Sequence, residues 1–198
     1  MLAAPVAVAL PSAFAIEYNQ YRLLPRLEGD YLHVAAANFS FLTGKSLQRL
    51  KDGASVAFVA QLIVSDTPNY LSTNARAVAR FAVSYDIWED RFSVTTITDR
   101  PEQKRTISHQ LAPAAESWCL DNLAILRAGL PSDRPLYLRL DLRVEDPRDQ
   151  AGVIGDSGIS LSKLVEIFSR PVRDKQDRYP TWTAGPIRLE DIPKGARG

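Results

Sequence analysis

Two segments alternate between apolar and polar side chains at every second residue, and this pattern constrains the fold more than any other feature of the sequence. In residues 136–144, Leu or Val at the even-numbered positions alternates with Tyr, Arg and Asp. In residues 76–87, the odd-numbered positions are all apolar or aromatic, whereas Arg, Ser and Asp occur on the other face. A period of two is typical of a β-strand with one buried and one solvated face. The chain is therefore predicted to form a sheet.

Other segments predict further strands and helices. The hydrophobic patterns favour additional strands over residues 31–41, 54–65 and 92–98. Trp182 and residues 187–192 are interpreted as a last docked strand or an extended tail. The segment 54–65 is apolar almost throughout, as expected for a central strand covered on both faces. Helical spacing of apolar residues predicts helices over residues 43–53, 112–126 and 160–168. Residues 18–30 and 99–110 are interpreted as irregular or loop segments.

The connections between these segments indicate the fold class. Residues 88–91 are few and polar, and a connection this short permits only antiparallel pairing of its flanking strands. Strands and helices do not alternate strictly, so we predict an α+β fold, a mainly antiparallel and sandwich-like β-sheet with two or three packed helices. Because 45% of the 198 residues are hydrophobic and 24% charged, residues 16–198 are predicted to form a single globular domain with irregular ends.

The N-terminal segment has features of a secretory signal. Residues 1–16 carry no charge, residues 3–10 are small or apolar, and small side chains precede a possible cleavage after Ala15. The segment is too short to span a bilayer, so no transmembrane span is expected. We predict a signal peptide over residues 1–15 and a periplasmic or secreted protein. No Lys or Arg precedes the apolar run, which is expected if the true start lies upstream or the chain is truncated. The alternative interpretation is a loose or docked N-terminal segment.

The numbers of charged, Cys and His residues argue against several ligand classes. Lys and Arg total 24 against 23 Asp and Glu, so the basic surplus typical of a nucleic-acid-binding protein is missing and no nucleic-acid partner is predicted. The single cysteine, Cys119, cannot form an internal disulfide. Together with the widely spaced His33 and His109, it forms no recognisable zinc ligand set. We predict neither a metal nor a cofactor.

Two short motifs resemble catalytic loops only in part. Residues 155–158 (GDSG) resemble the nucleophile loop of chymotrypsin-like proteases, but Ile159 and Ser160 interrupt the motif. Residues 43–46 (TGKS) resemble the end of a phosphate-binding loop, but the earlier glycine of such a loop is replaced by Phe39. The ordinary interpretation of both is a loop leading into the first turn of a helix.

No residues are therefore predicted to be catalytic, and two classes of alternative are kept. Cys119 is expected in the core, where burial makes a thiol inert. The first alternative is a periplasmic or secreted hydrolase with His33 or His109 as base, assisted by Asp86 or Asp141. The second is a structural subunit of an envelope assembly, which would offer a long unpaired strand edge.

The preferred hypothesis is a non-enzymatic envelope protein that binds a protein partner or an apolar small molecule. Trp88 falls on the polar face of its strand, next to the predicted turn. A large aromatic side chain exposed at such a place is typical of a partner surface. We therefore predict a partner surface containing Trp88, Arg91 and Arg80.

The order of features from Leu47 to Val144 resembles an uncharacterised family of exported proteobacterial proteins that carries only a domain-of-unknown-function label. The pieces that resemble it are Leu47-x-x-Leu50-x-x-Gly53, Ser84-Tyr85-Asp86, Phe92-Ser93-Val94, the helix from Ala114 to Trp118, and Tyr137-Leu138-Arg139-Leu140. They cover about half the chain. Residues 146–158 and the helix predicted after them have no counterpart. The resemblance implies an envelope protein with a signal peptide that works beside a membrane sensor or transport system, and it implies no catalytic residues.

Overall fold

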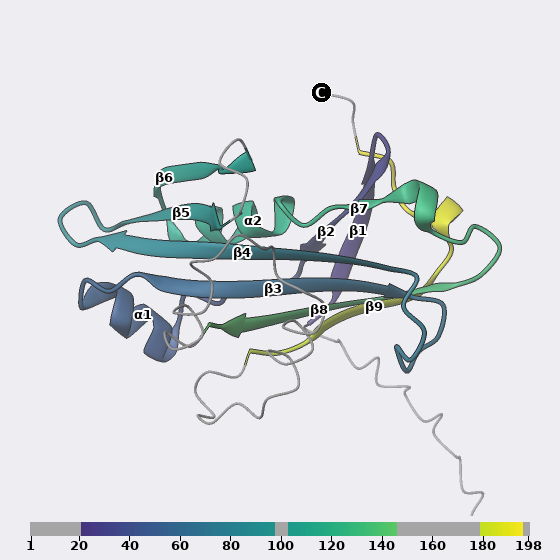
Figure 1. The fold of residues 1–198 in the computed structure, drawn as a ribbon, viewed down its shortest axis with the longest axis horizontal. Coiled ribbons are helices and arrows are strands. Elements are labelled where there is room, and N and C mark those ends of the chain that lie inside the picture. Colours follow the sequence, from purple (N-terminus) through teal and green to yellow (C-terminus); the bar gives the residue numbers. More distant parts are fainter. Residues whose placement is uncertain (1–20, 98–102, 146–178, 196–198) are drawn as a thin grey trace, which may run out of the picture.

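The computed structural model describes residues 21–97, 103–145 and 179–195 (Figure 1). The described chain forms two antiparallel sheets and two α-helices, which confirms the predicted α+β class. Its strands are β1 (Leu23–Glu28), β2 (Tyr31–Ala36), β3 (Val56–Ser65), β4 (Ala75–Asp86), β5 (Arg91–Ile97), β6 (Thr106–Gln110), β7 (Ile125–Leu126), β8 (Leu136–Val144) and β9 (Trp182–Ile187). The helices are α1 (Gly44–Lys51) and α2 (Ala112–Asp121).

The larger sheet is built around β3. Its six strands lie in the order β6-β5-β4-β3-β8-β9, and all ten residues of β3 are buried. β3 pairs antiparallel with β4 on one side and with β8 on the other. This confirms the predicted central strand that is covered on both faces, because side chains on either face of β3 are shielded from water. The alternating strands predicted from the sequence are its two neighbours.

The smaller sheet has the order β1-β2-β7 and shares one apolar core with the larger sheet. Buried side chains of β1 and β2 belong to the same cluster as those of β3, β4 and β8. Trp182 of β9 is fully buried, with its ring centroid 4.9 Å from that of Phe39. The two sheets are also joined by a parallel bridge between Arg22 and Thr183. Burial of this shared layer is the main term that stabilises such a fold.

The second helix is shorter than predicted. α2 ends at Asp121, and Ile125 and Leu126 form β7, which pairs with β2 instead of continuing the helix to residue 126. The apolar spacing over residues 112–126 does not distinguish a long helix from a short helix followed by a strand. Tertiary pairing with the edge of β2 decides the outcome. The helix predicted over residues 160–168 lies outside the described residues.

Two strands occur where the sequence indicates irregular segments. β1 lies within residues 18–30, and β6 within residues 99–110. β1 contains Pro25, which lacks a backbone N–H, and β6 shows no apolar alternation. β6 lies at the end of the larger sheet. Strands at sheet ends need little hydrophobic patterning, because their backbone pairing with one neighbour holds them in place.

Candidate functional site

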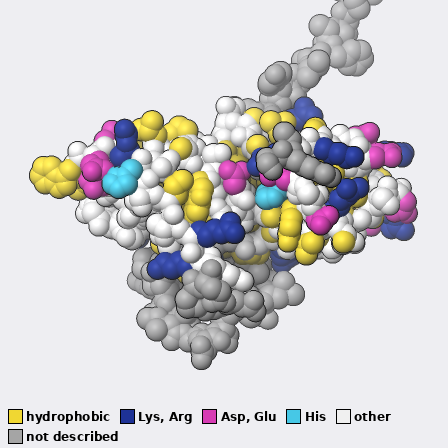
Figure 2. Space-filling view, turned by 90° about the horizontal axis from the view of Figure 1, so that it is seen from above, with side chains coloured by type: hydrophobic (Ala, Val, Ile, Leu, Met, Phe, Trp, Pro, Cys, Tyr) yellow, Lys and Arg dark blue, Asp and Glu magenta, His cyan; other side chains and the backbone are white. Residues whose placement is uncertain are grey.

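The turn between β4 and β5 projects from one end of the larger sheet (Figure 1). We call residues 86–91 the hairpin tip. Asp86 pairs with Arg91, so a four-residue connection carries Ile87 and Trp88 outward. The side chain of Trp88 is 96% exposed, and Ile87 is also exposed. In the space-filling view, hydrophobic side chains project at the left end of the molecule, beside acidic, basic and histidine side chains (Figure 2).

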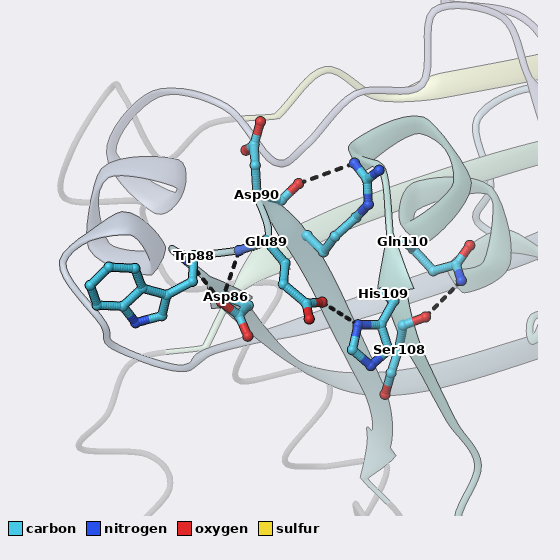
Figure 3. A network of polar contacts seen from close by, with 8 residues as sticks. Asp86, Trp88, Glu89, Asp90, Ser108, His109 and Gln110 are labelled. Atoms are coloured by element: carbon cyan, nitrogen blue, oxygen red, sulfur yellow. Dashed lines mark hydrogen bonds and ion pairs between the residues drawn. The ribbon is translucent and has the colours of Figure 1, made fainter.

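The backbone of the hairpin tip is held by its own carboxylates. One oxygen of Asp86 accepts hydrogen bonds from the backbone N–H groups of Trp88, at 2.8 Å, and Glu89, at 3.2 Å (Figure 3). The carboxylate of Asp90 accepts a hydrogen bond from the hydroxyl of Tyr85, and this bond is the main reason that the pKa of Tyr85 is raised. Asp90 has φ +53°, a left-handed conformation that Asp tolerates better than most residues. The turn is therefore ordered by specific local contacts.

A contact from β6 also supports the hairpin tip. Nδ1 of His109 lies 2.5 Å from a carboxylate oxygen of Glu89, and both side chains are largely exposed (Figure 3). His109 lies in a β-bulge: Phe92 pairs with Gln110 and Val94 with Ile107, so Ser108 and His109 together oppose Ser93. A bulge redirects the side chains of its strand. The left-handed φ of His109, +58°, belongs to this local distortion.

The structure corrects one residue of the predicted partner surface. Trp88 and Arg91 lie at the hairpin tip, but Arg80 is only 6% exposed and cannot belong to an exposed surface. Nη2 of Arg80 lies 2.7 Å from each carboxylate oxygen of Glu145, which is also buried. Alternation correctly places Arg80 on the face of β4 opposite the shared core. Alternation does not show that this opposite face of the sheet is itself buried near β3.

The residue pairs considered for a hydrolase are not brought together. His109 contacts Glu89, whereas the carboxylate of Asp86 accepts backbone N–H groups of the turn. His33 lies on β2, opposite Arg26, and Asp141 lies on β8, where it forms an ion pair with Arg139. The His109–Glu89 pair could orient an imidazole. A base also needs a proton-bearing group within hydrogen-bond reach, which no described contact of His109 provides.

Cys119 is buried in α2, as the sequence predicts. Desolvation raises the pKa of its thiol, and the nearby carboxylate of Glu116 adds to the effect. Because only the thiolate is an effective nucleophile, Cys119 is unreactive in the folded protein.

We expect that a maleimide will not label Cys119 in the native protein and will label it fully in denaturant. The labelled fraction, measured by intact mass against urea concentration, should follow the unfolding transition measured by circular dichroism. Rapid labelling of fully folded protein would show that the thiol is accessible and would contradict its placement in the core.

The residues considered for a phosphate-binding loop instead begin α1. Thr43 precedes the helix, and the hydroxyl of the buried Ser46 lies 2.8 Å from that of Tyr179. Ser46 is buried, and its hydroxyl is engaged by this contact within the protein. The motif over residues 155–158 lies outside the described residues.

Across residues 21–97, 103–145 and 179–195, no helix is long and apolar enough to cross a bilayer, and no group of three or more His, Cys, Asp or Glu side chains is arranged to hold a metal ion. No family model, curated protein or solved structure matches the chain. The resemblance described above therefore stays a prediction.

Sequence reasoning found part of the hairpin tip. Trp88 and Arg91 were identified from an aromatic side chain at the polar end of a strand. The contact between His109 and Glu89 was missed, because residues 99–110 were interpreted as a loop and the two residues are 20 positions apart. The sequence could indicate that His109 lies near Glu89 only if the pairing of β5 with β6 were already known.

Proposed function

We propose that this protein is an exported, non-enzymatic module that binds a protein partner through the hairpin tip. The observation that carries the proposal is the 96% exposure of Trp88 on a turn whose backbone is held by side-chain contacts. A tryptophan side chain buries about 150–250 Å² when it is covered. Trp88 does not belong to the core formed by the described residues, so this area is available to a partner.

The order of the turn favours binding by an anchor residue. Association costs conformational entropy for every side chain and loop that becomes immobile. At the hairpin tip, Asp86 and the Glu89–His109 contact hold the backbone around Trp88 before any partner arrives. Preordered aromatic residues of this kind are typical of the few positions that dominate the energetics of an interface.

The alternatives have less support. Small apolar molecules bind in concave sites, whereas Trp88 projects from a convex turn. A structural subunit assembled by strand addition would use a long, regular edge. β6, at one end of the larger sheet, has five residues and is bulged at His109, and bulges hinder pairing with another chain. Export is supported by the uncharged segment 1–16 and by the small residues that precede a possible cleavage after Ala15.

We expect Trp88→Ala to weaken binding of the partner by about 30-fold or more, since truncating a central aromatic anchor costs about 2 kcal/mol or more. The experiment compares immobilised wild-type protein and variant in retaining proteins from an envelope fraction, followed by affinity measurement with the retained protein.

Leu71→Ala is the matched control. Leu71 is 85% exposed in the loop between β3 and β4, at the other end of the 12-residue β4. Both variants should keep the stability of the wild type within about 0.5 kcal/mol, because neither side chain packs in the core. A partner that binds Trp88→Ala as tightly as the wild type would refute docking through the hairpin tip.

A further inference from the structure

We infer that the surface that receives the hairpin tip is an apolar pocket bordered by Lys or Arg side chains of a protein partner. The inference rests on the proposed function and specifies the chemistry of its partner. It follows from the charges that surround Trp88. Asp86, Glu89 and Asp90 contribute three negative charges, and Arg91 contributes one positive charge, so the hairpin tip has a net charge of −2.

The internal contacts of the hairpin tip leave this negative charge in place. Asp86 accepts neutral backbone N–H groups, and Asp90 accepts the neutral hydroxyl of Tyr85. The guanidinium of Arg91 donates to the backbone carbonyl of Asp90, at 3.4 Å, and forms no described ion pair with a carboxylate of the hairpin tip. Asp86 is the cross-strand partner of Arg91, but no ion pair between their side chains is described, and the carboxylate of Glu89 contacts the exposed imidazole of His109.

The negative charges flank the apolar anchor along the turn: the carboxylates precede Trp88 by two residues or follow it within two residues, and Ile87 and Trp88 are the exposed apolar side chains between them. The side chain of Glu89 is directed toward His109 and away from the indole of Trp88 (Figure 3). When Trp88 enters a pocket, these carboxylates come to its rim. A cationic rim would attract them, and an anionic rim would repel them through like-charge contact. An anionic lipid surface would repel the tip for the same reason.

The inference can be tested on the full chain with defined probes. The probes are an amphipathic helical peptide made of Leu and Lys, its counterpart made of Leu and Glu, and vesicles of phosphatidylcholine. The readout is the indole N–H resonance of Trp88 in a heteronuclear NMR spectrum. The protein has three tryptophans, so the resonance is assigned as the one that disappears in Trp88→Phe.

We expect the Leu/Lys peptide to shift the Trp88 resonance at low ionic strength and the Leu/Glu peptide to leave it unchanged. Raising the salt concentration to about 0.5 M should weaken the effect strongly, because exposed charges are screened over a few Å under those conditions. The double variant Glu89→Gln/Asp90→Asn keeps the hydrogen-bond acceptors and removes two charges, and it should bind the Leu/Lys peptide about tenfold more weakly.

Asp133→Asn is the matched control for charge, because Asp133 is an exposed carboxylate next to Arg134, which forms an ion pair with Asp66 at the far end of β3.

Equal shifts with both peptides would overturn the charge inference and leave apolar docking intact. A shift with vesicles alone would replace the protein partner by a lipid surface. If no probe moves the Trp88 resonance, charge complementarity is insufficient for recognition and the inference fails. Retention of a Trp88-dependent partner decides the proposed function separately.

Discussion

Replacing Glu145 by Leu is expected to lower the free energy of unfolding by about 3–5 kcal/mol, the usual cost of leaving one member of a buried ion pair without its partner. The Arg80 and Glu145 side chains are 6% and 2% exposed, and a single guanidinium nitrogen lies 2.7 Å from both carboxylate oxygens. Glu145→Leu keeps the volume of the side chain and removes the charge. The charged guanidinium of Arg80 then stays buried without the carboxylate that neutralises it.

Replacing both members of the ion pair by apolar side chains should recover most of the lost free energy of unfolding. Among the described residues, Nε of Arg80 has no hydrogen-bond partner, so the pair does not fully compensate for its own desolvation. We therefore expect Arg80→Met/Glu145→Leu to be close to the wild type or more stable. Urea denaturation of the single and double variants measures this coupling directly.

An exposed ion pair provides the comparison. Arg134 and Asp66 lie 3.3 Å apart, and Arg134 is largely exposed. Arg134→Ala should cost less than about 1 kcal/mol, because solvent screens the pair. If Glu145→Leu cost no more than Arg134→Ala, water would reach Arg80 and its assignment to a covered face would be wrong.

Glu116→Ala is expected to lower the free energy of unfolding by about 2–4 kcal/mol. Glu116 lies in α2, and one of its carboxylate oxygens accepts hydrogen bonds from the backbone N–H groups of Phe41, at 2.6 Å, and Leu42, at 2.7 Å. The hydroxyl of Ser40 donates to the same oxygen. Alanine would leave two buried N–H groups without an acceptor, each costing about 1–3 kcal/mol. Glu116→Gln keeps an acceptor oxygen and should be far less disruptive.

The two variants also make a prediction about pH. Burial raises the pKa of Glu116 above its ordinary value of 4.5, and the hydrogen bonds from Leu42, Phe41 and Ser40 offset this only in part. The native protein therefore holds this proton more tightly than the unfolded chain, and ionisation costs stability as pH rises above 4.5. Relative to Glu116→Gln, the wild type should lose stability through this range and then level off above the native pKa.

Urea midpoints at several pH values measure the difference between wild type and Glu116→Gln. A wild type that gained stability over Glu116→Gln as pH rose from 4.5 would mean that hydrogen bonding outweighs burial at this carboxylate. Equal stability of the Ala and Gln variants would show that water replaces the lost acceptor, and Glu116 would not be the residue that holds the segment before α1.

The strands with period-two alternation were predictable because burial of one face selects the residue at every second position. This applies to β8 and β4, whose predicted and observed limits agree within one residue. The continuous apolar run of β3 likewise predicts burial on both faces. β1 and β6 were missed, because their positions are set mainly by backbone pairing with a neighbouring strand. Backbone pairing constrains the types of side chain only weakly.

For the candidate site, Trp88 could be identified from its position at the polar end of a strand, but its supporting contacts could not. His109 reaches Glu89 only because β6 pairs with β5 and a bulge redirects its side chain. Arg80 shows the converse error: a charged residue on the face opposite the core suggests exposure, and the structure buries it against Glu145.

The amino-acid pattern alone determined the α+β class, the antiparallel pairing around the four-residue turn, and the location of β3, β4 and β8, because apolar periodicity follows directly from which side chains must avoid water. Only the tertiary structure decided which charges are paired and which face of the sheet is covered. These properties depend on residues that are distant in the chain, such as Arg80 and Glu145, and no local sequence pattern shows that such residues are in contact.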